Sequence, residues 1–213
     1  LELLEAMNIV VFRQSPYEAD DIIASLALWA VENGGEACIV SVDKDLCQCV
    51  REGVTILREH LGKIEVLDSD GVFEKMGVYP AQVPDYLGLL GDSSDNIPGV
   101  PGIGKKRAAD LLGEFETLEA AIEAAKGKTK PKFWGALAEN AEQALRSRDL
   151  ARVVADIDVG AAWDRFRWNY GASDELRNLL RRLEFRQLLE ELGGSTAEER
   201  KTDYATIRDA PGL

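Results

Sequence analysis

The sequence predicts an α/β fold, in which a partial, parallel-type central sheet with flanking helices is followed by an all-helical part. Three observations support this prediction. Helix and strand signals alternate as far as residue 83, and helical segments separated by glycine and proline replace them from Pro84 onward. A chain of 213 residues with 46% hydrophobic content is also long and apolar enough to bury a core.

Residues 1–83 form the first predicted region and contain the strand signals. A helix is expected from residue 19, because apolar residues keep helical spacing until Asn33-Gly34-Gly35 ends it. A β-branched run then predicts a strand that ends at Asp43. The expected elements are a short amphipathic helix at 1–4, a helix at 19–32, and strands at 37–42, 54–57 and 63–67, the last two around a turn at Gly62.

Residues 84–194 form the second predicted region, which is all-helical, and 195–213 are predicted to be a linker and the start of a further domain. Gly193-Gly194-Ser195 and the charged residues after it indicate the linker. The expected helices are 83–90, 105–112, 118–125, 133–154 and 175–192.

The net charge of −13, from 25 basic and 38 acidic residues, is unusual for a protein that binds nucleic acid, because lysine and arginine normally neutralise the phosphates. Positive charge is concentrated at 105–107 and in the lysines of 126–132, although a solvated loop explains the second group equally well. Three cysteines without paired spacing, no apolar run of membrane length and no leader predict a reduced, cytosolic protein.

Seven carboxylates lie in three short groups, and each group has an ordinary structural explanation as well as a functional one. The first opens a helix, where acidic residues complement the helix dipole. The second follows a buried strand, where a β-turn also favours aspartate, and an N-cap or Asx turn would explain the third. The groups are Glu18, Asp20 and Asp21; Asp43 and Asp45; and Asp92 and Asp95.

The coincidence of three such groups favours a metal centre. Bringing carboxylates together costs electrostatic repulsion, which bound cations remove. Ligands that are all oxygen favour Mg²⁺ or Mn²⁺ over zinc. Two such ions roughly 3.5–4 Å apart can activate water and accept charge on the leaving oxygen of a phosphodiester. The groups therefore predict a two-ion centre and hydrolysis without a protein nucleophile.

A glycine-rich turn, Gly99–Gly104, precedes a basic helix start at Lys105 and Lys106. Glycines let backbone amides approach a phosphate closely, and the helix N-terminus adds its dipole. The pattern predicts a sequence-independent grip on a nucleic-acid backbone, and a helical hairpin without a ligand is the alternative. The spacing fits neither a Walker loop nor a dinucleotide fingerprint.

Three segments, Tyr17–Ala24, Asp43–Gln48 and Gly91–Gly104, together resemble the 5′-nuclease (flap endonuclease) domain of bacterial DNA polymerase I. The resemblance extends from the first residue to about Gly194 and includes Leu183-Glu184-Phe185. It implies a PIN-like 5′-nuclease core followed by a helix-hairpin-helix subdomain. It also implies divalent-metal-dependent 5′-3′ exonuclease and flap endonuclease activity on DNA.

The resemblance implies a role for each carboxylate. Helical geometry alone would pair Glu18 with Asp21, whereas the family pattern favours Asp20, so Asp21 is the weaker metal candidate. The residues implied to be catalytic are Glu18, Asp20 and Asp43. The implied ligands are Glu18 and Asp20 on the first ion, Asp43 between the two ions, and Asp45, Asp92 and Asp95 on the second.

The hairpin of this family holds the backbone of duplex DNA and often a potassium ion. The residues that would do so here are Gly99, Val100, Gly102, Ile103, Gly104, Lys105 and Lys106. The implied cofactors are two Mg²⁺ or Mn²⁺ ions, and the implied partner is DNA with a 5′ flap, a nick or a gap. We expect a monomer in the bacterial cytoplasm, associated with the nucleoid, which removes primers and displaced strands in replication and repair.

Family members carry further metal-binding aspartates and a basic helical arch, all of which would precede Leu1. We therefore expect a fragment that lacks the first strands of its sheet and has little or no activity alone. Residues 203–213 are similar to the opening of a proofreading-like domain. This similarity favours a chain that continues into a DNA polymerase over a free-standing 5′-3′ exonuclease.

Two other functions also fit the residues. The chain could be a structure-specific DNA-binding module whose carboxylates bind metal without hydrolysis. It could also be a magnesium-dependent phosphatase or sugar-nucleotide enzyme that uses Asp43 and Asp45 as its carboxylate pair. Such an enzyme would have no use for the glycine-rich hairpin.

Overall fold

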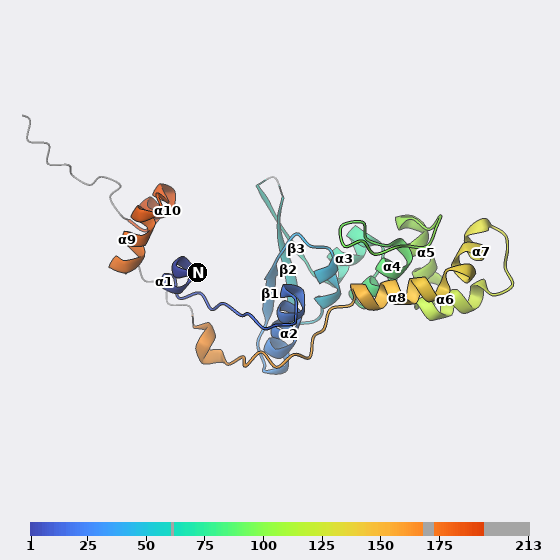
Figure 1. Ribbon diagram of the computed structural model, residues 1–213, viewed down its shortest axis with the longest axis horizontal. Helices are drawn as coiled ribbons and strands as arrows, with labels where there is room; N and C mark the ends of the chain where they lie inside the picture. The colour runs from blue at the N-terminus through green and yellow to red at the C-terminus, as the bar shows by residue number, and fades with distance from the viewer. Residues whose placement is uncertain (61, 168–172, 194–213) are drawn as a thin grey trace, which may run out of the picture. The chain divides into compact units, whose positions relative to one another are not determined.

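The computed structural model describes residues 1–60, 62–167 and 173–193, so the predicted region 195–213 lies outside the described residues. The described chain forms two compact units (Figure 1). One unit is Phe12–Ala161, and the other combines Leu1–Val11 with the described residues after Ala161. Each unit has its own cluster of buried apolar side chains.

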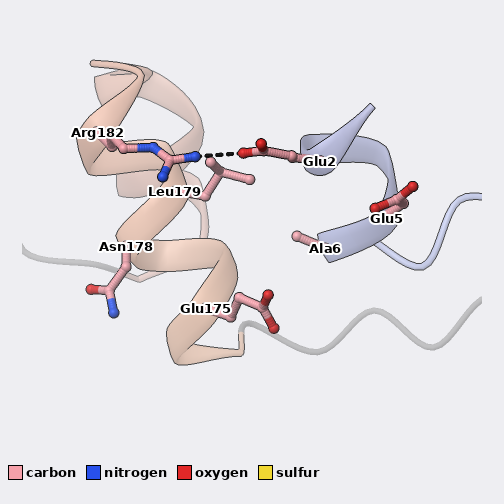
Figure 2. A pocket seen from close by; sticks show the side chains of 7 residues that line it. All are labelled: Glu2, Glu5, Ala6, Glu175, Asn178, Leu179 and Arg182. Carbon is pink, nitrogen blue, oxygen red and sulfur yellow. Dashed lines mark hydrogen bonds and ion pairs between the residues drawn. The ribbon is translucent and has the colours of Figure 1, made fainter.

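The smaller unit is helical. Leu176 and Leu180 pack against Leu189, and apolar side chains of the first helix cover them. A pocket of about 760 Å³ opens between the first helix and α9, where Arg182 pairs with Glu2 at 2.5 Å (Figure 2). The elements of this unit are α1 (Glu2–Ala6), η3 (Trp163–Phe166), α9 (Asp174–Arg182) and α10 (Arg186–Glu191).

The larger unit carries all seven carboxylates and the glycine-rich hairpin. No helix in the described ranges is both long and apolar enough to cross a bilayer. The elements of the larger unit are α2 (Ala19–Glu32), β1 (Ala37–Val40), η1 (Asp45–Cys49), β2 (Val54–His60), β3 (Lys63–Leu67), α3 (Ser69–Met76), η2 (Pro80–Gln82), α4 (Val83–Leu90), α5 (Lys105–Phe115), α6 (Leu118–Ala125), α7 (Lys132–Glu139) and α8 (Ala141–Ala151).

A three-stranded sheet in the order β1-β2-β3 forms the first half of the larger unit. β1 runs parallel to β2, with Ile39 opposite Ile56, and β2 runs antiparallel to β3, with Ile56 opposite Leu67. The predicted parallel pairing is thus confirmed for the first two strands, and the third strand closes a hairpin. β1 stops at Val40, two residues before the predicted end, and β2 continues to His60.

The two faces of this sheet have different surroundings. Side chains alternate between the faces along each strand, so one face carries every second residue. One face is packed into the core together with α2 and α3. Its buried members are Ile39, Val54, Ile56, Arg58 and Leu67. The other face leaves large apolar side chains exposed, and these are Val40, Ile64 and Val66.

Helix α4 is the centre of the helical half, and its residues Leu87 and Leu89 are fully buried. It packs along α8 at close range because position 88 has no side chain. A Cβ atom at Gly88 would lie 2.8 Å from the carbonyl oxygen of Ala144 and 2.9 Å from Cβ of Arg148. Close packing against this central helix fixes the start of the loop that follows it.

Several predicted helices are confirmed. The helices predicted at 83–90 and 118–125 have those bounds, and the helix predicted from 105 continues to Phe115. A helix that the sequence analysis did not predict, α3, follows the last strand. The Asp68 carboxylate caps it by accepting from the Gly71 N–H at 2.8 Å, and Gly77 ends it in the left-handed conformation.

Two predicted helices are wrong in extent. The helix predicted at 133–154 is two helices that meet at Asn140, whose side-chain amide donates to the Ala136 carbonyl at 2.8 Å and so competes with the helical backbone. Residues 152–154 are not helical, and Arg152 already has an extended backbone. The helix predicted at 175–192 is interrupted by Glu184, which has a φ of 58°. Glutamate gives no local signal for such a break, because it is a good helix former.

The close approach of α4 and α8 predicts opposite effects for two glycine-to-alanine substitutions inside helices. Gly88→Ala should lower the free energy of unfolding by about 1–3 kcal/mol, because the new methyl group overpacks the contact with α8. Gly113→Ala in α5 meets no atom within 4 Å and should raise it by up to about 1 kcal/mol through helix propensity. Urea unfolding of both variants measures this, and an equal gain in both would contradict the packing argument.

Candidate functional site

An acidic cavity of about 370 Å³ lies where the start of α2, the end of β1 and the loop after α4 meet. Six of the seven predicted carboxylates line it, together with Asn96, Ile97 and the segment 150–153. Asp92 does not line the cavity but lies next to it, because carboxylate oxygens of Asp45, Asp92 and Asp95 lie within 4.8 Å of one another. The six lining carboxylates are Glu18, Asp20, Asp21, Asp43, Asp45 and Asp95.

The first group of carboxylates is placed by the N-terminus of α2. The Asp21 side chain accepts a hydrogen bond from the Glu18 N–H at 3.2 Å, which fixes the helix start. Its other oxygen accepts from the Val154 N–H at 2.8 Å and ties down the extended chain after α8. Both Asp21 oxygens therefore hold backbone, while Glu18 and Asp20 are presented to the cavity.

The second group is placed by a tight turn after β1. The Asp43 N–H donates to Ser41 Oγ at 3.1 Å, and Asp43 Oδ1 accepts from the Asp45 N–H at 2.9 Å. This is an Asx turn, which uses one carboxylate oxygen for local structure. The Asp43 carbonyl accepts from the Arg58 guanidinium at 2.9 Å. Asp43 is thus held at three of its polar atoms.

The third group is placed by a short loop after α4. Asp92 is buried, and one of its oxygens accepts from the Ser94 N–H at 2.9 Å and the Ser94 hydroxyl at 2.6 Å. Its other oxygen accepts from the Lys44 ammonium. Lys44 Nζ also forms an ion pair with Asp45, at 3.3 Å from its Oδ1. This oxygen is buried and accepts no hydrogen bond from the described residues. Lys44 thus competes with any cation for Asp45 and Asp92.

The pKa values of these carboxylates differ in direction. Burial raises the pKa of Asp20, and the negative charges of Asp43 and Glu18 raise it further. Burial also raises the pKa of Asp45, although the Lys44 charge opposes it. For Asp92, burial would raise the pKa, but hydrogen bonds from Lys44 and Ser94 outweigh it and lower the value to about 2. The cavity therefore holds closely spaced negative charge at Asp20 and at Asp45, where Lys44 offsets only part of it, and a bound cation would stabilise both carboxylates.

The donor set fits a hard divalent cation. Several carboxylate oxygens converge in one cavity, and such ligands suit Mg²⁺, Mn²⁺ or Ca²⁺. No cysteine lines this cavity among the described residues. Cys47 and Cys49 are buried in the core behind it, and burial raises the pKa of the Cys49 thiol to about 11. The chemistry of the site is therefore that of oxygen ligands, as the sequence predicted.

The loop between α4 and α5 carries both the third carboxylate group and the glycine-rich turn. Asp92 and Ile97 form an isolated antiparallel bridge, with bonds of 2.8 and 2.7 Å. Gly99 then crosses the end of α4 so closely that a Cβ atom there would overlap the Leu90 carbonyl. Gly102 has a φ of 79°, a conformation that glycine adopts without strain. The loop is therefore compact and held by its own backbone.

The residues predicted to bind a nucleic-acid backbone fall into two kinds. The side chains of Val100 and Ile103 are buried, and their N–H groups donate to the carbonyls of Leu89 and Val100. They hold the turn in place. Gly102, Gly104, Lys105 and Lys106 are exposed, and Gly99 is half-buried. Any contact with a phosphate would come from the exposed group.

The start of α5 has no side-chain cap. Its N-cap residue is Gly104, so the first amides of the helix keep their hydrogen-bonding capacity. Side chains of Asp68, Thr117 and Ser173 cap α3, α6 and α9, whereas α4, α7 and α8 also begin without a side-chain cap, so the combination of lysines with the glycine-rich turn is what distinguishes the start of α5. Arg107 donates to the Gly102 carbonyl at 2.5 Å and stacks on Phe133 at 4.7 Å, which joins the turn to α7. An uncapped helix start beside lysines is suited to bind an anion.

Sequence reasoning missed the polar residues that hold the site. Gln48 donates to the Ala151 carbonyl at 2.9 Å and accepts from the Val153 N–H at 3.1 Å, which brings the chain after α8 against the cavity. Lys44 and Ser94 are neighbours of the predicted aspartates and carry no separate pattern. Arg58 had a usable signal, because it follows Val54 and Ile56 at the buried positions of a strand.

Comparison with protein families gives two adjoining matches. The family model described as 5′-3′ exonuclease, N-terminal resolvase-like domain, matches residues 1–77. The model described as 5′-3′ exonuclease, C-terminal SAM fold, matches residues 78–174. Together they cover both the acidic cavity and the glycine-rich hairpin.

Curated relatives of the chain include DNA polymerase I from several bacteria. The protein of Bacillus subtilis (strain 168) is 38% identical over 199 residues, which is 92% of this chain and 23% of that protein. The protein of Synechocystis sp. is 37% identical over 202 residues, 90% of this chain and 20% of that protein. The chain thus spans about a quarter of the length of the relatives it matches.

Solved structures with a similar fold include T5 5′-exonuclease and the catalytic core of Rad2. T5 5′-exonuclease with divalent metal ions (zinc) bound matches with a TM-score of 0.64 and 23% identity, over 71% of this chain and 55% of that chain. The catalytic core of Rad2 in complex with DNA substrate matches with a TM-score of 0.60 and 20% identity, over 90% of this chain and 66% of that chain. At such identities the likeness shows the fold.

The low pKa of Asp92 predicts a pH-dependent effect of Asp92→Asn. Its folded pKa of about 2 lies below the ordinary value of 3.8, so the ionised group stabilises the fold above about pH 4. This stabilisation is lost as the pH falls toward 2. Without metal, the variant should unfold more easily by on the order of 1–2 kcal/mol at pH 7, and the difference should shrink below pH 4.

Urea unfolding of both proteins at pH 7, 4 and 3, with a chelator present, measures this difference. Asp70→Asn at the exposed start of α3 is the matched control, because it removes the same charge outside the cavity. A destabilisation by Asp92→Asn that stays constant over this pH range would show that the ion pair with Lys44 is not its cause.

Proposed function

The chain belongs to the 5′-3′ exonuclease family, and we propose that it is the 5′-3′ exonuclease and flap endonuclease part of a bacterial DNA polymerase I. One observation carries this proposal. Carboxylates from three separate segments converge on one cavity, and the loop that supplies the third group continues directly into an uncapped, basic helix start. A phosphatase or sugar-nucleotide enzyme would need only the first of these features.

The proposed ligands follow the placement of the carboxylates. Glu18 and Asp20 would hold a first ion at the start of α2, and Asp43, which lines the same cavity, would contribute to both ions. Asp45, Asp92 and Asp95 would hold a second ion, for which Lys44 now occupies the Asp92 carboxylate. Mg²⁺ or Mn²⁺ is the proposed cofactor. When bound, such a pair of ions supplies activation of water and stabilisation of charge at the phosphorus.

The proposed role of the hairpin is to hold the DNA backbone beside the cavity. The first amides of α5 and the exposed lysines Lys105 and Lys106 contact phosphates, which carries no sequence preference. We further propose that a potassium ion binds at this turn and that the substrates are flapped, nicked or gapped duplexes. We also propose that the complete protein is a monomer that acts at the nucleoid, and that its chain continues into proofreading-like and polymerase domains.

The proposed division of the chain follows the same logic. In this division residues 1–83 supply the first two carboxylate groups and residues 84–194 supply the third group and the hairpin, although Leu1–Val11 and the described residues after Ala161 form the separate helical unit. The two family models meet at residues 77 and 78, close to this division. Cleavage chemistry and DNA binding thus belong mainly to different halves that share one cavity.

Asp43→Asn should abolish metal-dependent cleavage by the complete protein while DNA binding is retained. Asparagine keeps the Oδ1 acceptor of the Asx turn, so the turn survives, but it removes the negative charge between the proposed ions. The cleavage rate on a 5′-flap duplex should fall by more than the roughly 10–100-fold that is typical for the loss of a residue that only orients a metal ligand. Asp70→Asn is the charge-matched control, and retained cleavage in Asp43→Asn would exclude this mechanism.

Lys105→Gln with Lys106→Gln should weaken DNA binding and make it less sensitive to salt. Each lost phosphate contact lowers the slope of log K against log salt by about 0.9, so a loss approaching 2 is expected. Titrations of a duplex between about 50 and 200 mM salt measure the slope. Lys63→Gln with Lys75→Gln removes the same charge from β3 and α3 and should leave the slope unchanged. Equal slopes for native and hairpin variants would argue against the hairpin as the DNA contact.

A further inference from the structure

Arg58 is a charged residue at a core position of the sheet. It lies on the buried face of β2, in line with Val54 and Ile56, and only 9% of its surface is exposed. A guanidinium remains protonated in proteins, so the structure holds a permanent positive charge at this place. Burying a charge costs free energy unless hydrogen bonds or opposite charges compensate for it, so the contacts of this guanidinium must account for its position.

The contacts of Arg58 are with the turn that carries Asp43. Its Nη2 donates to the Asp43 carbonyl at 2.9 Å and lies 3.4 Å from the Cys47 sulfur. Its Nε is buried and makes no hydrogen bond within the described residues. No carboxylate lies within ion-pair distance of it in the described part of the chain. The shortest hydrogen bond of the guanidinium is therefore the one to the main-chain carbonyl of Asp43, a residue that lines the cavity.

This bond completes the fixation of Asp43. The N–H of Asp43 is held by Ser41, and its Oδ1 accepts from the N–H of Asp45, which closes a ring that contains the peptide after Asp43. The carbonyl oxygen of that peptide points out of the ring and is held by neither bond. The bond from Arg58 to the carbonyl fixes that peptide from the sheet side. The remaining oxygen, Oδ2, then has a defined direction in the cavity that Asp43 lines.

We propose that Arg58 is a positioning residue of the metal centre, which fixes the Asp43 peptide and thereby sets the affinity of the carboxylate cluster for divalent cations. This inference rests on the proposed function, because it assumes that Asp43 binds metal. Partners that orient metal ligands in this way typically contribute about 10–100-fold to metal affinity or activity. Arg58 is a residue that acts through Asp43 and does not itself reach the cavity lining.

Two substitutions of Arg58 and one matched control test the proposal in the complete protein. Arg58→Met keeps the apolar stem and removes the donors, and Arg58→Lys keeps the charge and one donor. Arg51 is the control, because its Nε donates to the Cys49 carbonyl at 3.3 Å, at the other end of the same η1 segment. Arg51→Met therefore loosens the segment without touching Asp43.

Binding of Mn²⁺, followed by electron paramagnetic resonance, is the main measurement. Arg58→Met should bind Mn²⁺ about 10–100-fold more weakly than the native protein, Arg58→Lys should lie between them, and Arg51→Met should stay within about twofold of native. In cleavage assays, the Mg²⁺ concentration for half-maximal rate should rise in the same order, while KM for DNA stays unchanged. A residue that only stabilises the fold would not move the affinity of the folded protein.

Native affinity in Arg58→Met, or an equal loss in Arg51→Met, would overturn the proposal. If Arg58→Met does not fold, Arg58→Lys decides, because weaker Mn²⁺ binding supports the proposal and native binding refutes it. Failure of the proposed function looks different. In that case the native protein itself would bind no Mn²⁺ at the cavity, and Asp43→Asn would change nothing.

Discussion

Mutual repulsion among carboxylates around one cavity is the constraint on which the larger unit depends. Asp20 and Asp45 are partly buried near other negative charges, and their raised pKa values record the cost of this arrangement. A chain that gathers such groups must hold them against their tendency to separate. The start of α2, the turn after β1 and the loop after α4 each contribute hydrogen bonds that keep these carboxylates in place.

Most of the hydrogen bonds that keep the carboxylates in place are donated by backbone N–H groups to the carboxylate oxygens themselves. Asp21 receives two main-chain N–H groups, Asp43 receives one, and Asp92 receives one together with a hydroxyl. The cation of Lys44 neutralises the most buried member. One oxygen of such a residue can thus serve structure while the other serves chemistry, which reconciles capping and turn formation with metal binding in the same side chains.

Local patterns in the sequence predicted most elements, and they failed where a single residue overrides its neighbours. The spacing of apolar residues predicted α2, α4 and α6, because each helix buries one face. The break at Asn140 involves a side-chain hydrogen bond, and the break at Glu184 lies where the chain takes a positive φ between two helices that both contribute to one apolar cluster; periodicity records neither. For the site, motif order predicted which carboxylates meet. It could not predict Lys44 or Arg58, because their roles depend on contacts between distant segments.

The crossing of Gly99 over the end of α4 has a mechanical consequence. Residues 92 to 104 form one short, backbone-braced loop whose first part faces the acidic cavity and whose last part begins α5. Because no side chain separates the loop from the helix it crosses, the helix end fixes the position of the loop at Gly99. The distance between the acidic cavity and the start of α5 is therefore set by a short run of main chain, so a backbone held at one end is in register with the carboxylates at the other.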